Sequence, residues 1–125
     1  MTGALVVPTG MTDEILRDDR AGLERAAEHY LDACFRARTC VRASELAGQL
    51  DLTAPYLSRI AAELLQEPIS DYLRRKQLEH ACRLLKVTPL TIEEIALSSG
   101  FGTARTLYRV FRETYRMTPD EYRKT

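Results

Sequence analysis

Four arginines near the end of the chain have a spacing that could make one binding face. They stand at i, i+4, i+7 and i+11: Arg105, Arg109, Arg112 and Arg116. On a helix this spacing gathers them within about 60° of one another. Guanidinium groups are forked donors suited to base edges and phosphates. The row therefore indicates a surface that could contact nucleic acid.

The opposite side of the same predicted helix is apolar. Leu107, Val110 and Phe111 fall there, whereas Tyr108 lies beside the arginines and the small Ala104 stands near the helix start. We expect no acidic residue at i±4 of these arginines. Like charges at that spacing repel one another, so the row would be a poor pattern for a merely solvated surface. This pattern favours a binding face. A solvated surface face is the other interpretation of such a row.

The whole chain is neutral, with 18 Lys+Arg and 18 Asp+Glu in 125 residues. Residues 1–40 carry 5 basic and 7 acidic side chains, and the charge of the rest is only mildly positive. Neutrality argues against a protein that binds nucleic acid through a high total charge. Any electrostatic role therefore depends on where a few cations are placed.

Composition favours an all-α protein. Leu, Ala, Glu and Arg are common, Trp is absent, and hydrophobic residues make up 45% of the chain. The longest apolar run, residues 4–7, is far shorter than the roughly 20 residues of a membrane span. No secretory signal pattern is present. We expect a cytoplasmic protein without a membrane partner.

The residues that often bind metals or catalyse reactions are few and scattered. Cys34, Cys40 and Cys82 show no C-x-x-C spacing, and His29 and His80 stand at no usual zinc spacing. The cysteines are expected to be free, mostly buried thiols. The sequence contains no nucleophile–base arrangement and no Gly-rich phosphate loop. We therefore expect no metal, no cofactor and no enzymatic activity.

Seven helices and no strand are expected from apolar periodicity and from capping residues. The predicted helices are 16–38, 44–50, 54–66, 69–86, 92–99, 103–115 and a short last one from 119. Thr53 is a predicted N-cap. Thr91 with Glu94 and Thr118 with Glu121 are predicted capping boxes.

Two segments about 50 residues apart repeat each other. The tripeptide ELA at 45–47 is echoed by EIA at 94–96, and Arg59 is echoed by Arg109. Each copy predicts a short helix, a tight turn and a longer helix. Such helix–turn–helix units are typical of DNA-reading proteins, although a helical hairpin used only for packing gives the same pattern.

The predicted turns each hold a residue that tolerates a left-handed backbone, Asp51 in the first copy and Gly100 in the second. In the first copy the outward face of the longer helix is small and nearly uncharged, with Arg59 as its only base. That face could enter a groove with Ser58 and Arg59 as readers, but it would make few phosphate contacts.

A specific set of motifs runs through the chain. In the second half these are Ile92-x-Glu94-Ile95-Ala96, Gly100-Phe101, Arg109-Val110-Phe111-Arg112, Met117-Thr118-Pro119 and Tyr122-Arg123. In the first half they are Glu45-Leu46-Ala47, Tyr56-Leu57-Ser58-Arg59, Tyr72-Leu73, Ala81 and Leu84-Leu85. Over about residues 20–124 the chain resembles the AraC/XylS family of bacterial transcription regulators.

The resemblance implies a homeodomain-like fold with two helix–turn–helix lobes joined by a linker helix. The implied organisation is a flexible lead-in at 1–15, a first lobe at 16–68, a linker helix at 69–86 and a second lobe at 87–125. Recognition helices at about 54–66 and 103–115 would enter adjacent major grooves of double-stranded DNA. RNA polymerase is a further candidate partner, and a monomer or weak dimer is the expected state.

The resemblance also implies roles for individual residues. The base-reading residues would be Pro55, Ser58, Arg59, Ala104, Arg105, Tyr108 and Arg109. The residues contacting the DNA backbone would be Thr106 and Arg112.

Several positions depart from the family pattern. Ala61-Ala62 stands where Phe-Lys is common, Gln77 where the linker helix often has Arg, and Leu107 where Phe is common. Arg116 replaces a helix-ending glycine, so the expected working face is Arg105, Tyr108, Arg109 and Arg112. The alternative function is a helix–turn–helix module repurposed for protein–protein interaction, such as an anti-activator.

The residues before the first predicted lobe are too few to hold the effector-sensing domain that most family members carry. A stand-alone regulator and an excised domain are both compatible with this length. The helix at 16–38 could belong to the first lobe or bury its apolar stripe against a partner.

Overall fold

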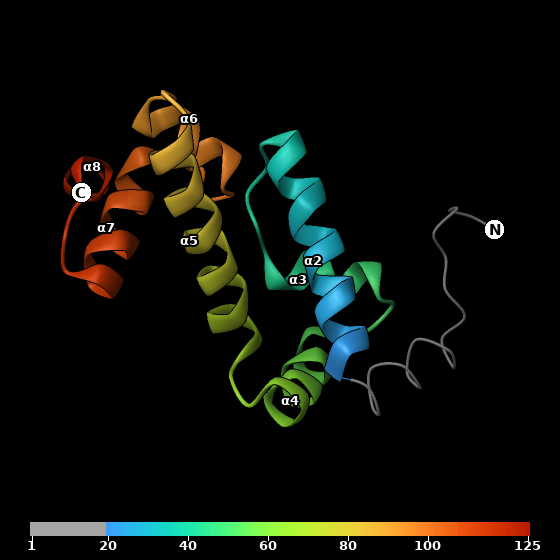
Figure 1. Cartoon of the computed structure of the whole chain (residues 1–125). Helices are drawn as coiled ribbons and strands as arrows, with labels where there is room; N and C mark the ends of the chain where they lie inside the picture. Colours follow the sequence, from blue (N-terminus) through green and yellow to red (C-terminus); the bar gives the residue numbers. More distant parts are fainter. Residues whose placement is uncertain (1–19) are drawn as a thin grey trace. The chain divides into compact units, whose positions relative to one another are not determined.

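The computed structural model describes residues 20–125, which form helices joined by short connecting segments (Figure 1). Seven helices and no strand occur in it: α2 (Arg20–Ala37), α3 (Ala43–Gln49), α4 (Ala54–Leu65), α5 (Ile69–Val87), α6 (Ile92–Ser98), α7 (Ala104–Tyr115) and α8 (Pro119–Lys124). The predicted all-α class is confirmed. The predicted lead-in at 1–15 and the first residues of the helix predicted from 16 lie outside the described range.

The predicted helix starts are confirmed by their caps. The Thr53 hydroxyl accepts a hydrogen bond from the Tyr56 amide at 3.2 Å. The Thr91 hydroxyl accepts one from the Glu94 amide at 3.1 Å, and the Glu94 carboxylate accepts one from the Thr91 amide at 2.9 Å. Thr118 and Glu121 form the same reciprocal pair at the start of α8. Each cap satisfies amides that the first helical turn leaves without a partner.

Both predicted turns contain a left-handed residue. Asp51 lies between α3 and α4 with φ 60°, and Gly100 lies between α6 and α7 with φ 79°. The two turns therefore use the same backbone device, once with aspartate and once with glycine.

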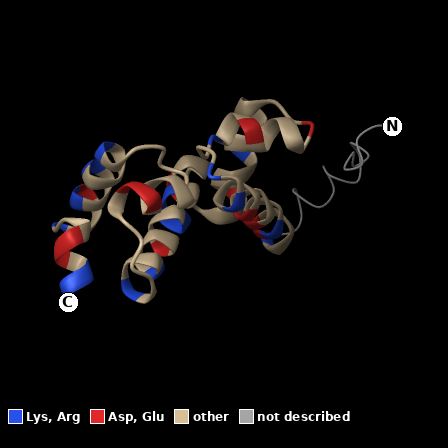
Figure 2. Ribbon diagram, turned by 90° about the horizontal axis from the view of Figure 1, so that it is seen from above, with Lys and Arg blue, Asp and Glu red and all other residues tan. Residues whose placement is uncertain are grey.

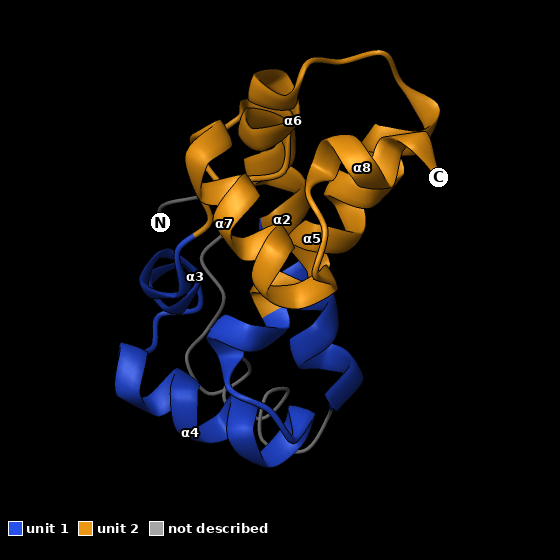
Figure 3. Ribbon diagram, turned by 90° about the vertical axis from the view of Figure 1, so that its left-hand side faces the viewer, with its two compact units in different colours: residues 1–30, 42–72 blue, residues 31–41, 73–125 orange. Residues whose placement is uncertain are grey.

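The chain packs as two compact units (Figure 3). Within the described range, unit 1 comprises residues 20–30 and 42–72, and unit 2 comprises residues 31–41 and 73–125. Both α2 and α5 therefore contribute residues to each unit. The four-part division expected from the sequence stays a prediction, and residues 31–41 pack with the second helix–turn–helix.

Unit 1 buries the apolar faces of α2, α3 and α4. Its buried hydrophobic side chains are Leu23, Ala27, Tyr30, Leu46, Ala47, Leu57, Ile60, Ala61, Leu65, Ile69 and Tyr72. The Tyr30 hydroxyl accepts a hydrogen bond from the Arg42 amide at 2.9 Å and donates one to the Glu45 carboxylate at 2.7 Å. This bond pair fixes the start of α3 against α2, because the amide precedes the first helical turn of α3.

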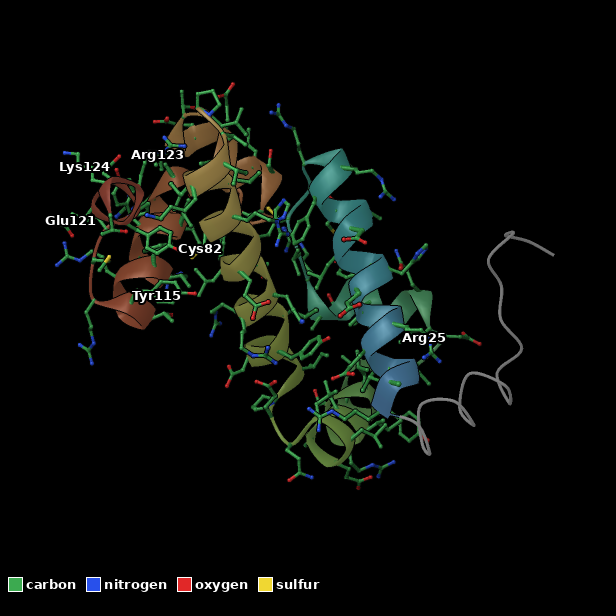
Figure 4. All side chains as sticks on the ribbon, in the orientation of Figure 1. Arg25, Cys82, Tyr115, Glu121, Arg123 and Lys124 are labelled. Atoms are coloured by element: carbon green, nitrogen blue, oxygen red, sulfur yellow. The ribbon has the colours of Figure 1, made fainter. Side chains whose placement is uncertain are left out.

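Unit 2 has its core between α5, α6 and α7. The buried members are Leu78, Ala81, Leu85, Ile95, Ala96, Leu107, Val110 and Phe111. Arg123 of α8 closes the carboxyl end of α5, as its guanidinium donates to the Leu85 carbonyl at 3.0 Å and to the Thr88 carbonyl at 3.1 Å. Figure 4 shows Arg123 between α8 and α5. The pairing satisfies carbonyls at a helix end and neutralises their partial charge.

The turn of the second helix–turn–helix is held from two directions. The Gly100 carbonyl accepts a hydrogen bond from the Val41 amide at 3.1 Å. The Ser99 carbonyl accepts one from the buried Gln77 side chain of α5 at 3.1 Å. The turn that orients α7 is therefore fixed by the segment before α3 and by the middle of α5.

Candidate nucleic-acid interface

The arginine row of α7 lies opposite the buried side of that helix. Leu107, Val110 and Phe111 are exposed by only 0%, 4% and 0%, so they anchor α7 in unit 2. The side chains on the other side are exposed: Arg105, Arg109 and Arg112. We call this exposed side, together with Tyr108 at its edge, the arginine face. The back-to-back geometry expected from the sequence is confirmed.

Arg116 is not part of the arginine face. It is the C-cap of α7, with a left-handed backbone at φ 62° and ψ 25°. Its amide donates to the Arg112 carbonyl at 3.0 Å, which closes the last turn of the helix. Of the four arginines in the row, three therefore lie on the exposed side of α7 and the fourth, Arg116, is the residue that ends the helix.

Arg109 has an acidic neighbour that our reading of the sequence missed. Glu113 stands at i+4, and its Oε2 lies 3.7 Å from Nη1 of Arg109. The expectation that no acid occupies i±4 of the row is therefore wrong for Arg109, and in the sequence also for Arg116, which Asp120 follows by four residues. Both side chains are more than half exposed, so water screens the pair strongly. The spacing alone was sufficient to find this partner.

Tyr108 is tied to the next helix. Its hydroxyl donates a hydrogen bond to Asp120 Oδ2 in the first turn of α8. This bond and the partial burial of the ring raise the pKa of Tyr108 to about 12. The hydroxyl is therefore protonated and already engaged at physiological pH.

The start of α7 is closed by threonines. The Thr103 hydroxyl accepts from the Thr106 amide at 3.2 Å and pairs with the Thr106 hydroxyl at 3.1 Å. Thr106 and Ala104 are half-buried at this end of the helix. The amide and hydroxyl of Thr106 thus pair with Thr103 within the protein, and its expected contact with the DNA backbone stays a prediction.

In unit 1 the corresponding helix, α4, has smaller exposed side chains and a single basic residue. Pro55, Ser58 and Arg59 are all exposed, as a contact with DNA requires. The Arg59 guanidinium lies 5.0 Å from the centre of the Tyr56 ring, a cation–π arrangement that restrains it. Ala61 is fully buried. Alanine in place of the phenylalanine of the family pattern therefore removes volume from the core and leaves the exposed surface unchanged.

Charge is mixed along the helices of both units rather than collected on one of them (Figure 2). The candidate site residues therefore form two separate faces, one on α4 and one on α7, of which only the α7 face gathers several cations. The side-chain contacts that our reading of the sequence missed involve Asp120, Glu113 and Tyr56. Asp120 could not be assigned from spacing, because it lies on a different helix from Tyr108.

Other kinds of site find no support in this part of the chain. Cys34, Cys40 and Cys82 are free thiols, of which Cys34 is buried and the other two are half-buried. Across residues 20–125, no three His, Cys, Asp or Glu side chains come together as metal ligands. None of the helices within that range is both long and apolar enough to cross a membrane.

Known proteins share this arrangement. A sequence profile described as a helix-turn-helix domain matches residues 46–125. An HTH-type transcriptional regulator of Mycobacterium tuberculosis is 35% identical over 89 residues, which is 71% of this chain. The chain spans only 34% of the length of that regulator.

Two solved structures extend the comparison to the fold. The C-terminal domain of the two-component response regulator yesN from Fusobacterium nucleatum is 30% identical, with a TM-score of 0.69 over 90% of this chain and 98% of that one. The DNA-binding domain of the global transcriptional factor AdpA, solved with a target DNA, is 20% identical, with a TM-score of 0.65 over 95% and 92%. The two structures share the fold, and the profile match shows that the chain belongs to the AraC-type helix–turn–helix family.

Proposed function

We propose that this chain is a sequence-specific regulator of transcription that binds double-stranded DNA, with α4 and α7 entering adjacent major-groove segments. The arginine face of α7 is the observation that carries the proposal. It combines a buried anchor on one side of the helix with three exposed guanidinium groups on the other. A major groove admits one helix, and guanidinium forks match the acceptors of guanine and of phosphates.

We assign the roles of individual residues from the family pattern, applied to positions on the two helices. In unit 2, Arg105 and Arg109 are assigned to base edges and Arg112 to a phosphate, while Tyr108 and Ala104 line the groove. In unit 1, Ser58 and Arg59 read bases, and Pro55 contributes a small apolar contact. Because α4 carries a single cation, unit 2 supplies most of the electrostatic affinity.

The proposal also covers the oligomeric state, the cellular location and the protein partner. The binding species is a monomer or weak dimer in the cytoplasm, and RNA polymerase is the partner through which bound protein affects transcription. No catalytic step is assigned to the chain. The support for these statements is family membership, in which the relatives are regulators of transcription.

One observation favours a second candidate function. The exposed surface of α4 is nearly uncharged, with Pro55, Ser58 and Ala62 on it, and the whole chain is neutral. A small, neutral helix face suits a protein partner as well as a groove. In this alternative the fold is a protein-interaction module, such as an anti-activator.

A selection from random duplexes followed by sequencing tests the main proposal and reports the binding site. We expect a defined motif with two half-sites in adjacent major grooves. We also expect about 3–5 neutralised phosphates and hence a slope of about −3 to −4 in log K against log salt. A chain that shifts no duplex at low salt would overturn the proposal and favour the protein-interaction module.

A further inference from the structure

An acidic side chain holds the aromatic residue of the arginine face. Tyr108 donates its hydroxyl to Asp120, and the two residues come from α7 and from the first turn of α8. Asp120 is exposed, whereas Tyr108 is half-buried. The bond therefore lies at the edge of the surface to which we assign DNA reading.

We propose that Asp120 is a positioning residue that determines specificity: by holding the Tyr108 hydroxyl, it withholds this donor from DNA bases and leaves the ring of Tyr108 to contact them. The inference deepens the proposed DNA-binding function and rests on it. In this proposal Asp120 sets the base preference at this edge of α7 through its contact with Tyr108, and Asp120 itself does not contact the base.

The hydrogen-bonding capacity of a phenol supports this assignment. Tyr108 has one O–H donor, and a carboxylate is a stronger acceptor for it than a neutral base atom. While Asp120 holds that donor, the ring remains available for apolar contact, for which the thymine methyl group is the natural partner in a major groove. Arg105 and Arg109 are then the strong donors of the arginine face.

The repeat gives an internal comparison. The residues 50 positions earlier are Ser58, in place of Tyr108, and Ser70, in place of Asp120. Both serines are exposed, and neither side chain is a phenol or a carboxylate. The holding contact is therefore specific to unit 2, and Ser58 in unit 1 has no acidic residue at the matching position.

The contact can be tested first in the free protein. Carbon-13 NMR of labelled tyrosines follows the titration of each ring, and the missing signal of Tyr108→Phe assigns Tyr108. We expect Tyr108 to titrate near pH 12 in the native chain and to move down toward 10 in Asp120→Ala. A native Tyr108 that titrates near 10 would overturn the inference. The matched control is Glu93→Ala, which removes a carboxylate that acts on Tyr108 only through its charge.

The effect on DNA is tested by duplex selection with the same variants. Asp120→Ala should create a new preference for an acceptor atom at one base pair, about 2- to 10-fold, because the hydroxyl is released. Tyr108→Phe in the Asp120→Ala background should abolish the new preference. Asp120→Asn keeps only a neutral acceptor, so it should raise affinity for all duplexes and show the new preference more weakly than Asp120→Ala. Glu93→Ala should create no new preference.

The outcomes separate the inference from the function on which it rests. If the native chain binds DNA and Asp120→Ala selects the native motif, the positioning role is wrong and the proposed function stands. If Asp120→Ala folds poorly, Asp120→Asn with unchanged thermal unfolding still decides: a new preference for an acceptor atom supports the inference, and selection of the native motif contradicts it. If the native chain binds no duplex, both the proposed function and the reading role fall, whatever the titration shows.

Discussion

Gln66 and Arg116 end the two longer helices of the repeat in the same left-handed backbone conformation. Their φ and ψ angles are 62° and 26° for Gln66, the C-cap of α4, and 62° and 25° for Arg116, the C-cap of α7. Arg116 stands 50 residues after Gln66. Neither position carries the glycine that adopts this conformation most readily, so each helix ends with a strained residue.

Replacing Arg116 with glycine should stabilise the protein by about 1 kcal/mol, because glycine has no Cβ to penalise the left-handed backbone. Denaturant unfolding measures the gain. Arg116→Ala is the matched control: it removes the same charge and keeps the Cβ, so it should give no gain. Equal stabilisation by both variants would mean that charge, not backbone strain, is responsible.

Gly100→Ala should destabilise the protein by about 2 kcal/mol or more. The residue has φ 79°, and an added Cβ would lie 2.5 Å from Cγ2 of Val41. The control is Gly48→Ala, where an added Cβ meets nothing within 4 Å in helix α3. That change should stabilise by about 0.5–1 kcal/mol, as expected for an alanine in a helix. Thermal unfolding of the two variants should move in opposite directions.

Gln77→Leu should cost about 1–3 kcal/mol, since the buried Ser99 carbonyl loses the donor that the side chain supplies. The shape of the residue is nearly kept, so the cost reports the hydrogen bond. Gln49→Leu, at an exposed glutamine of α3, serves as the control and should change stability by less than about 0.5 kcal/mol. Similar losses in both variants would contradict the role of the bond.

Arg109→Ala should weaken binding to the selected duplex by about 1–3 kcal/mol and relax the preference at one base pair. Glu113→Gln should act in the opposite direction, because it frees Arg109 and removes a negative charge near the phosphates. We expect an affinity gain of about 2- to 5-fold at low salt. Thr114→Ala, an exposed and uncharged neighbour, should leave affinity unchanged. A mobility assay across salt concentrations measures all three variants.

The capping box of α6 should make stability depend on acid pH. Hydrogen bonds from the Thr91 amide and hydroxyl lower the pKa of Glu94. A lowered pKa in the folded state means that the stabilisation is present above the ordinary glutamate value and is lost as pH falls through the lowered value. The Tm difference between the native chain and Glu94→Gln should thus be largest near pH 7 and shrink toward pH 3. Glu93→Gln, which removes a carboxylate of the same helical turn outside the box, is the matched control.

Local features of this fold were predictable from sequence, because their physics is local. Thr91 and Glu94 stand three residues apart, and a capping box needs only that spacing. Gly100 and Asp51 were identified as turn residues because few side chains tolerate a left-handed backbone. The arginine face followed from helical periodicity, which fixes the angular position of each side chain once the helix is assigned.

The contacts between elements could not be predicted in this way. Tyr108 meets Asp120 only because α8 folds back beside α7, and no spacing encodes that approach. Gln77 did give a signal, as a polar residue four positions after Leu73 on the apolar side of its helix. The signal shows that Gln77 is buried but does not reveal that its partner is the Ser99 carbonyl, 22 residues later.

The hydrogen bond from Val41 to Gly100 has a consequence for exchanging parts between relatives. A contiguous graft that starts at residue 46, where the profile match begins, carries the turn of the second helix–turn–helix without the amide that holds it. A chimera would need the host's own residue at position 41 to present the same donor and a similar methyl group. The transplantable module is therefore two separate stretches of sequence, and a single-crossover recombinant inherits only one of them.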